Sequence, residues 1–143
     1  VGTGHSPAQP LASTQLSRIS TEAFAALDAA QVAALTVTQV RTLATTQIAA
    51  LAAADVAEFA DTQIAAMTAT QVQALSTTVI ADIEAAQIAA LDITQIAALS
   101  TTQLDHLSTT NISSLTTTQV YAFTSTQVAS LDAGQIEAYL AVA

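Results

Sequence analysis

An eight-residue period runs through this sequence without a break and leaves few folds open to it. When the sequence is aligned on the Gln of TTQIAAL, the segment that begins at Thr45, sixteen octads cover residues 15–142 with no insertion. Gln fills twelve of the sixteen equivalent positions, here called the Gln slots, and the exceptions are Ala23, Asp55, Val79 and Asn111. Such unbroken spacing is typical of a repeat protein whose units pack on their neighbours.

Each octad carries two apolar residues, which we call the first and second anchors. The first anchor follows the Gln slot, as Ile48 follows Gln47, and the second stands three residues further on, as Leu51 does. In one long helix the anchors would rotate by about 80° per octad, so they would form no continuous apolar stripe. A coiled coil requires a period near 7 or 11 and fails for the same reason.

A β-solenoid is the alternative architecture, but the octad suits it poorly. A spacing of three puts the two anchors on opposite faces of a strand, and Ala and Gln are poor strand formers. We therefore predict an all-α fold, a solenoid or superhelix of about sixteen very short helices with one helix per octad. The pattern leaves the number of octads per superhelical turn open.

The octad also contains its own helix start signal. A Ser, Thr or Asp stands three residues before most Gln slots, which is the pattern of a capping box. In that motif the cap side chain accepts from the N3 amide, while the Gln reaches back to the cap amide. The predicted helix caps are Ser20, Asp28, Thr36, Thr68, Ser76, Asp92, Ser100, Ser108, Thr116, Thr124 and Asp132.

A helix this short cannot be stable alone. Burying two anchors does not offset the backbone entropy of ordering eight residues, so the octads are expected to stack on one another. The residue after the first anchor varies most and is expected to face water. Examples are Arg41, Gln73, Asp105, Tyr121 and Glu137.

The two ends of the sequence depart from the octad. We predict an N-terminal arm or leader over residues 1–14 and the solenoid over residues 15–143. At the other end Leu140 stands where a polar cap is expected. Neither end shows a polar capping repeat, so we expect either a segment of a longer array or head-to-tail docking, which builds a filament. The candidate assembly ends are Pro7, Pro10, Leu11, Tyr139, Leu140 and Val142.

The composition excludes several classes of partner. The net charge is −9, Lys is absent, and Arg18 and Arg41 are the only fixed cations, so we expect no nucleic-acid partner. No apolar run approaches the roughly 20 residues that cross a bilayer, so membrane insertion is not expected either. Lack of Lys and Cys suits an exposed extracellular life, and the start at Val1 suggests a secreted chain whose signal has been removed.

Few residues suggest chemistry. His5 and His106 are the only histidines and stand about a hundred residues apart, and no G-x-S-x-G motif appears. Two acidic groups match no calcium-binding motif: Asp55, Glu58 and Asp61, and separately Asp82 and Glu84. We expect no enzymatic activity, no metal and no cofactor.

A Thr before the Gln slot is the one regular surface feature. If each octad advances by a fixed rotation and rise, these hydroxyls form rows that could bind ice or a glycan, or carry O-linked sugar. Equally, Thr is tolerated in a first helical turn and keeps a rod soluble without charge. The candidate row is Thr38, Thr46, Thr62, Thr70, Thr78, Thr94, Thr102, Thr110, Thr118 and Thr126.

The consensus L-[STD]-x-T-Q-[IV]-x-A-L, as in LDITQIAALSTTQL from Leu91, resembles octapeptide repeat arrays in very large secreted or surface proteins of Gram-negative bacteria. Those proteins are described as adhesin- or hemagglutinin-like. The resemblance implies an extracellular structural or adhesive part, and it brings no functional residues with it. The leading hypothesis is a non-enzymatic unit of an extracellular filament, matrix fibre or adhesin stalk, with copies of itself or adjoining repeats as partners. A Thr-row module that binds ice or glycan is the alternative.

Overall fold

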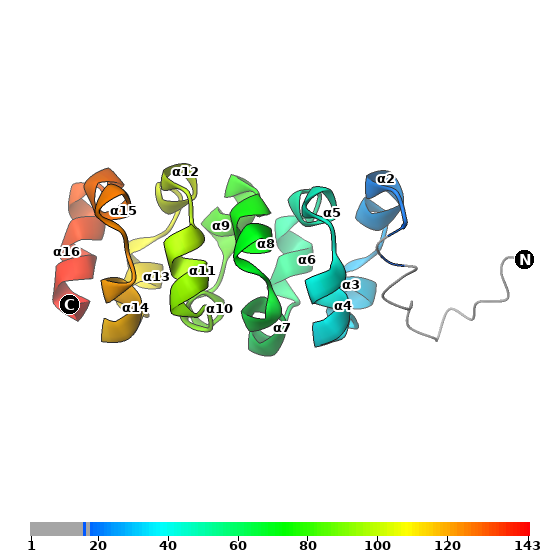
Figure 1. Cartoon of the computed structure of the whole chain (residues 1–143), viewed down its shortest axis with the longest axis horizontal. Coiled ribbons are helices and arrows are strands. Elements are labelled where there is room, and N and C mark those ends of the chain that lie inside the picture. Colours follow the sequence, from blue (N-terminus) through cyan, green and yellow to red (C-terminus); the bar gives the residue numbers. More distant parts are fainter. Residues whose placement is uncertain (1–15, 17) are drawn as a thin grey trace, which may run out of the picture.

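The computed structural model describes residue 16 and residues 18–143, and the regular structure in this part of the chain is entirely helical. No strand occurs there, so the β-solenoid alternative is wrong and the all-α solenoid is confirmed (Figure 1). The predicted arm over residues 1–14, with Pro7, Pro10 and Leu11, lies outside the described residues. The helices are α2 (Thr21–Ala25), α3 (Ala29–Ala33), α4 (Val37–Thr42), α5 (Thr45–Ala49), α6 (Ala53–Ala57), α7 (Asp61–Ala66), α8 (Ala69–Ala74), α9 (Thr77–Asp82), α10 (Ala85–Ala89), α11 (Ile93–Ala98), α12 (Thr101–Leu104), α13 (Thr109–Ser113), α14 (Thr117–Tyr121), α15 (Ser125–Ser130) and α16 (Ala133–Val142).

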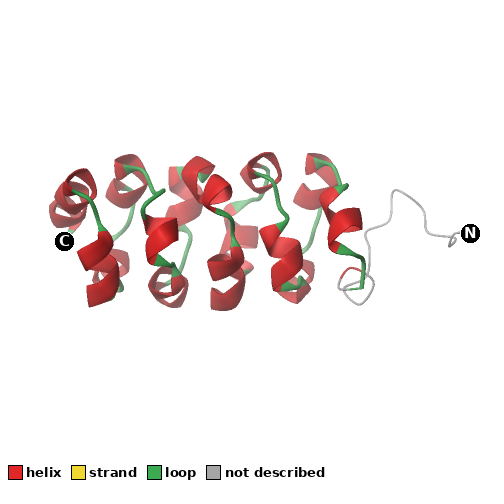
Figure 2. Ribbon diagram, turned by 90° about the horizontal axis from the view of Figure 1, so that it is seen from above, coloured by secondary structure: helices red, strands yellow, loops and turns green. Residues whose placement is uncertain are grey.

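Helix α4 shows how one octad starts and stops a helix. Thr36 is extended, with φ −75° and ψ 163°, and its side chain accepts from the backbone N–H of Gln39. The helix ends at the second anchor, Leu43, which is extended with φ −64° and ψ 138° and whose N–H donates to the Val40 carbonyl at 3.2 Å. The next cap, Ala44, is extended as well. Two consecutive extended residues thus separate α4 from α5. Figure 2 shows that short loops join the helices along the whole described chain.

The helices stack in three columns, because each helix packs on the one three octads earlier. Column 1 consists of α2, α5, α8, α11 and α14; column 2 of α3, α6, α9, α12 and α15; column 3 of α4, α7, α10, α13 and α16. Helices α2 and α16 lie at opposite ends of the long axis of the resulting rod (Figure 1). The hydrogen bonds between coils join residues 28 to 31 positions apart, so one turn holds between three and four octads.

The core is one continuous cluster of anchors that extends along the rod. Ile48, Ile64, Ile80 and Ile96 are first anchors and are 0% exposed, and they belong to one cluster with the second anchors. The variable positions expected to face water are exposed in the structure, Arg41 and Tyr121 among them. Stacking therefore hides both anchors of the interior octads, as the pattern required.

Helix α16 differs from the others because it does not stop at the second anchor. It runs for 10 residues, through Tyr139 and Leu140 to Val142, and packs on both α13 and α14. The absence of a polar cap at Leu140 removes the local signal that ends the other helices. The last helix is therefore longer than the octad predicts.

Candidate functional site

The side chains that set the geometry of this solenoid are the caps and the Gln slots. All eleven predicted caps, Ser20 through Asp132, accept a hydrogen bond from the backbone N–H three residues later. The Gln Oε1 closes the box by accepting from the cap N–H, as Gln95 does from Asp92 at 2.8 Å. Ala44, which has no acceptor side chain, still donates its N–H to Gln47 at 2.8 Å.

In most described octads the other end of the Gln side chain reaches the coil below. The Nε2 of Gln71 donates to the carbonyl oxygens of Val40 at 2.8 Å and Leu43 at 2.9 Å, which lie 31 and 28 residues earlier. We call the set of such inter-coil bonds the amide ladder. Within the described residues its members are Gln47, Gln63, Gln71, Gln87, Gln95, Gln103, Gln119, Gln127 and Gln135.

The ladder explains why the slot takes Gln and never Glu, although either suits a capping box. The carbonyls it bonds lie in the last turn of a helix, and in each rung one of them is the carbonyl of the second anchor, as Leu43 is for Gln71 and Leu35 for Gln63. Only an amide can accept from its own cap and donate to these oxygens at once. Each Gln thus caps the start of one helix and the end of another.

Sequence reasoning found the first role of the Gln and missed the second. Capping acts over three residues and is visible in a motif, whereas the ladder joins residues 28 to 31 apart. The available signal in the sequence was that Gln fills twelve of the sixteen slots and Glu fills none, although Glu serves a capping box equally well. Every buried side-chain N or O in the described part of the chain has a hydrogen-bond partner.

The exceptional slots interrupt the ladder. Asp55 keeps the capping bond, with its carboxylate accepting from Ala52 N–H at 3.2 Å, but has no amide to donate. Val79 can do neither. Asn111 is one methylene shorter than Gln and keeps one inter-coil bond, to Ile83 at 3.1 Å.

The ten residues of the candidate Thr row are all exposed, and they are distributed over the three columns of helices. Column 1 carries Thr46, Thr70, Thr94 and Thr118 on four successive helices that pack on one another. Column 2 carries Thr on its last three helices, Thr78, Thr102 and Thr126, and column 3 is interrupted by Ala86. The longest run of Thr along the rod is therefore the one of four in column 1.

The C-terminal end of the rod exposes apolar surface that interior coils bury. Val128 and Ile136, both first anchors, are half-buried, whereas Ile96 and Ile112 are 0% exposed. Of the candidate assembly residues here, Leu140 is 64% exposed, and Val142 and Tyr139 are half-buried. Tyr139 also packs on Phe123, with ring centroids 5.8 Å apart. We call Val128, Ile136, Tyr139, Leu140 and Val142 the C-terminal end face.

The described titratable residues are scattered over the surface of the rod. His106 is exposed, and its Nδ1 lies 2.9 Å from the Thr102 carbonyl oxygen. No group of three or more His, Asp or Glu side chains among residues 16 and 18–143 is placed to hold a metal ion. A surface depression lies between octads of successive coils, and its lining includes Arg41, Asp92 and Gln95. In the described part of the chain no helix has the length and apolar character needed to span a bilayer.

A family model described as the ALTTAQ repeat matches residues 80–117 of this chain. The matched segment contains ALSTTQ at residues 98–103, which includes the cap and Gln slot of α12. This match supports a repeat protein, in agreement with the octad pattern and the stacked helices. Neither the search of curated proteins nor the search of solved structures found a significant match.

Proposed function

We propose that this protein is a non-enzymatic structural unit that assembles end to end into an extracellular filament, matrix fibre or adhesin stalk. The observation that carries the proposal is the C-terminal end face, where Val128 and Ile136 keep the chemistry of buried anchors but are only half covered. Another coil of the same kind, from a second copy or from adjoining repeats, would cover them as interior coils cover theirs. Contact between unlike ends repeats without closing and gives an open filament.

The composition agrees with this proposal, and the charge opposes it only at low ionic strength. With eleven acidic residues and two arginines, copies of the chain repel one another, and this repulsion is screened at physiological ionic strength. The absence of Lys and Cys suits an exposed extracellular setting. The adhesin-like context follows from the resemblance of the octads to arrays in large secreted proteins.

Measuring particle mass over a range of protein concentrations tests the proposal. Light scattering should show particle mass rising with protein concentration. The rise should be steeper at about 150 mM salt than at about 10 mM, because the charges of neighbouring copies repel over a shorter distance at the higher salt. Electron microscopy of the same samples should show unbranched rods one solenoid wide. Particles that stay monomeric across concentration and salt would contradict the assembly of this chain.

A second candidate function is a binding module that uses the Thr row of column 1 to bind a glycan or ice. Exposure of Thr46, Thr70, Thr94 and Thr118 on consecutively packed helices favours it. The combined change Thr70→Tyr and Thr94→Tyr should abolish polysaccharide pull-down or ice growth inhibition without unfolding the rod. The matched control is Thr78→Tyr with Thr102→Tyr in column 2, which should retain binding.

A further inference from the structure

Helices α5 and α6 begin without the side-chain bond that starts most of the other helices. Their caps, Ala44 and Ala52, have no acceptor side chain, whereas Thr68 accepts from the N3 amide at the start of α8. The bond back to the cap is also long in α6, where the Ala52 nitrogen lies 3.2 Å from the Asp55 carboxylate. Both helix starts are therefore weaker than that of α8.

The same two helices each lack a bond of the amide ladder. Slot 55 lies 28 residues after Leu27, and slot 79 lies 28 residues after Leu51, which is the spacing of a ladder bond. Asp55 and Val79 fill these slots and have no amide to donate. Correspondingly, the carbonyl oxygens of Leu27 and Leu51 accept no hydrogen bond from any described residue. Helix α6 thus lacks its bond to the coil below, and α5 lacks its bond from the coil above.

The other helices from α4 to α12 do not combine the two losses. Helices α7 and α10 also lack a side-chain cap bond, but Gln63 and Gln87 keep their ladder bonds. Helix α9 has no amide at Val79 but is capped by Ser76. Helices α8, α11 and α12 have both kinds of bond. The two losses coincide only at α5 and α6, which are consecutive in the chain.

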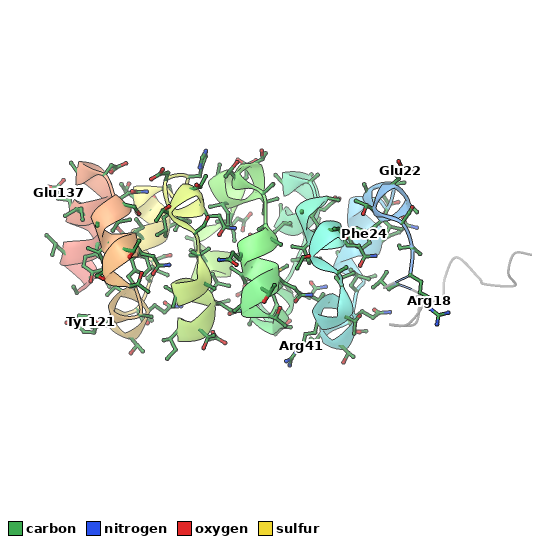
Figure 3. All side chains as sticks on the ribbon, turned by 45° about the horizontal axis from the view of Figure 1, so that its top comes forward. Arg18, Glu22, Phe24, Arg41, Tyr121 and Glu137 are labelled. Atoms are coloured by element: carbon green, nitrogen blue, oxygen red, sulfur yellow. The ribbon has the colours of Figure 1, made fainter. Side chains whose placement is uncertain are left out.

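No ion pair replaces the missing bonds. Arg41, on the preceding helix α4, points away from the rod (Figure 3) and has no ion-pair partner among the described residues. Asp55 on α6 and Glu58 at its C-cap stand three residues apart, a spacing at which like charges repel. Charge therefore loosens this part of the rod.

We propose that residues 44–59, which span α5 and α6, are an opening point of the solenoid. In a solenoid the stability is close to a sum of terms within repeats and between neighbouring repeats, so local opening concentrates where these terms are smallest. The opened segment presents an extended backbone, which makes it the place where an endoprotease cuts the rod. This inference is independent of end-to-end assembly, because it compares helices inside one copy.

Amide hydrogen exchange of the full chain, followed by NMR, tests the opening point. The N–H groups of Val56 and Phe59 donate within α6 and its C-cap, as those of Ile96 and Leu99 do in α11. Protection factors at Val56 and Phe59 should be at least about tenfold lower, because each missing bond shifts the opening equilibrium by roughly fivefold. Equal protection of α6 and α11 would overturn the inference.

Restoring the missing amides separates this cause from others. Asp55→Gln combined with Val79→Gln gives both slots a donor at the ladder spacing and should raise the protection of Val56 by about tenfold or more. The matched control is Ala57→Gln with Ala81→Gln, which adds two Gln side chains at exposed positions of α6 and α9 and should leave protection unchanged. Low protection that persists in the restored chain would show that the missing bonds are not the cause.

A second pair of changes covers the case in which the restored chain does not fold. Ala44→Ser with Ala52→Ser adds the two missing cap acceptors at residues that already have an extended cap backbone. It should raise protection across residues 44–59 by about fivefold or more, with little change in α11. No rise in this variant would overturn the inference as well.

Proteolysis gives an independent measurement of the same opening. Glu58 and Glu84 are both exposed, so exposure alone does not favour cleavage at either. A Glu-specific protease should cut the native chain after Glu58 at least about tenfold faster than after Glu84, because cleavage follows the population of the opened segment. Asp55→Gln with Val79→Gln should remove most of this difference. Cleavage after Glu84 that is as fast as cleavage after Glu58 would contradict the opening point.

Discussion

The side-chain amide of Gln95 donates to the carbonyl oxygen of Met67 at 2.6 Å across 28 residues of sequence. The same side chain accepts from the cap N–H of Asp92 at 2.8 Å, three residues away. One residue thus starts its own helix and closes the end of a helix in the coil below. Because this arrangement repeats along the rod, single substitutions in the Gln slots report directly on how the coils are held together.

Replacing Gln95 by Glu should destabilise the fold. The carboxylate keeps the capping acceptor but faces the carbonyl oxygens of Ile64 and Met67. Both lose the bond from the Gln95 amide, and the Ile64 carbonyl keeps its bond from the Met67 N–H. We expect a loss of about 1 to 3 kcal/mol in the free energy of unfolding at pH 7, measured by urea denaturation. Gln73→Glu is the control, because Gln73 is exposed and its side chain takes no part in the ladder.

The penalty in the Gln95→Glu variant should depend on pH. Burial next to carbonyl oxygens disfavours the charged form, so the pKa of the introduced carboxyl should lie higher in the folded state than its unfolded value of about 4.3. The folded state then holds the proton more tightly, and stability relative to the parent chain falls as pH rises from about 4.3 to the folded pKa. Equal penalties at pH 4 and pH 7 would contradict this explanation.

Asn111→Gln should stabilise the fold by adding the capping bond that this octad lacks to its inter-coil bond. Asn111 is buried and bonds the Ile83 carbonyl at 3.1 Å, but the N–H of Ser108 donates to no described residue. A Gln at this position reaches both the cap N–H and the coil below. We expect a gain of about 1 kcal/mol in thermal or chemical denaturation. Asn111→Ala should lose stability instead, and no change in either variant would argue against the ladder as a stabilising device.

Ala44→Ser should add a missing cap. Ala44 already has the extended backbone of a cap, with φ −71° and ψ 154°, close to the −74° and 160° of Ser100. Its lack of an acceptor leaves the N–H of Gln47 bonded to the Ala44 carbonyl at 3.0 Å. We expect a gain of about 1 kcal/mol by denaturation. Ala49→Ser, on the exposed face of the same helix, should give no gain.

Two isoleucines on α11 separate core from surface. Ile96 is 0% exposed and Ile93 is 52% exposed. Ile96→Ala should cost about 2 to 5 kcal/mol because it opens a cavity between coils, and Ile93→Ala should change stability by less than about 0.5 kcal/mol. Denaturation curves of the two variants side by side test the position of α11 in the solenoid. Similar costs for both would contradict the assignment of Ile96 to the core.

Local chemistry made much of this fold predictable from sequence. The caps at Ser100 and Asp92 act within three residues, so a motif reveals them before any packing is known. The anchors are equally easy to identify in the sequence, because an apolar pair at fixed spacing recurs in each octad. The unexpected length of α16 also has a local cause, because the apolar Leu140 stands where the other octads have a cap.

By itself the sequence determined the octad, the short capped helices, the buried anchors and hence the need to stack. Only the tertiary structure decided that helices pack three octads apart, that a turn exceeds three octads, and that Gln47 bonds Leu16 and Ile19. It also decided that the longest run of aligned Thr is the one of four in column 1. The physical reason is distance along the chain, since capping is settled within one turn of helix, whereas the fit of coil on coil depends on side chains about thirty residues apart.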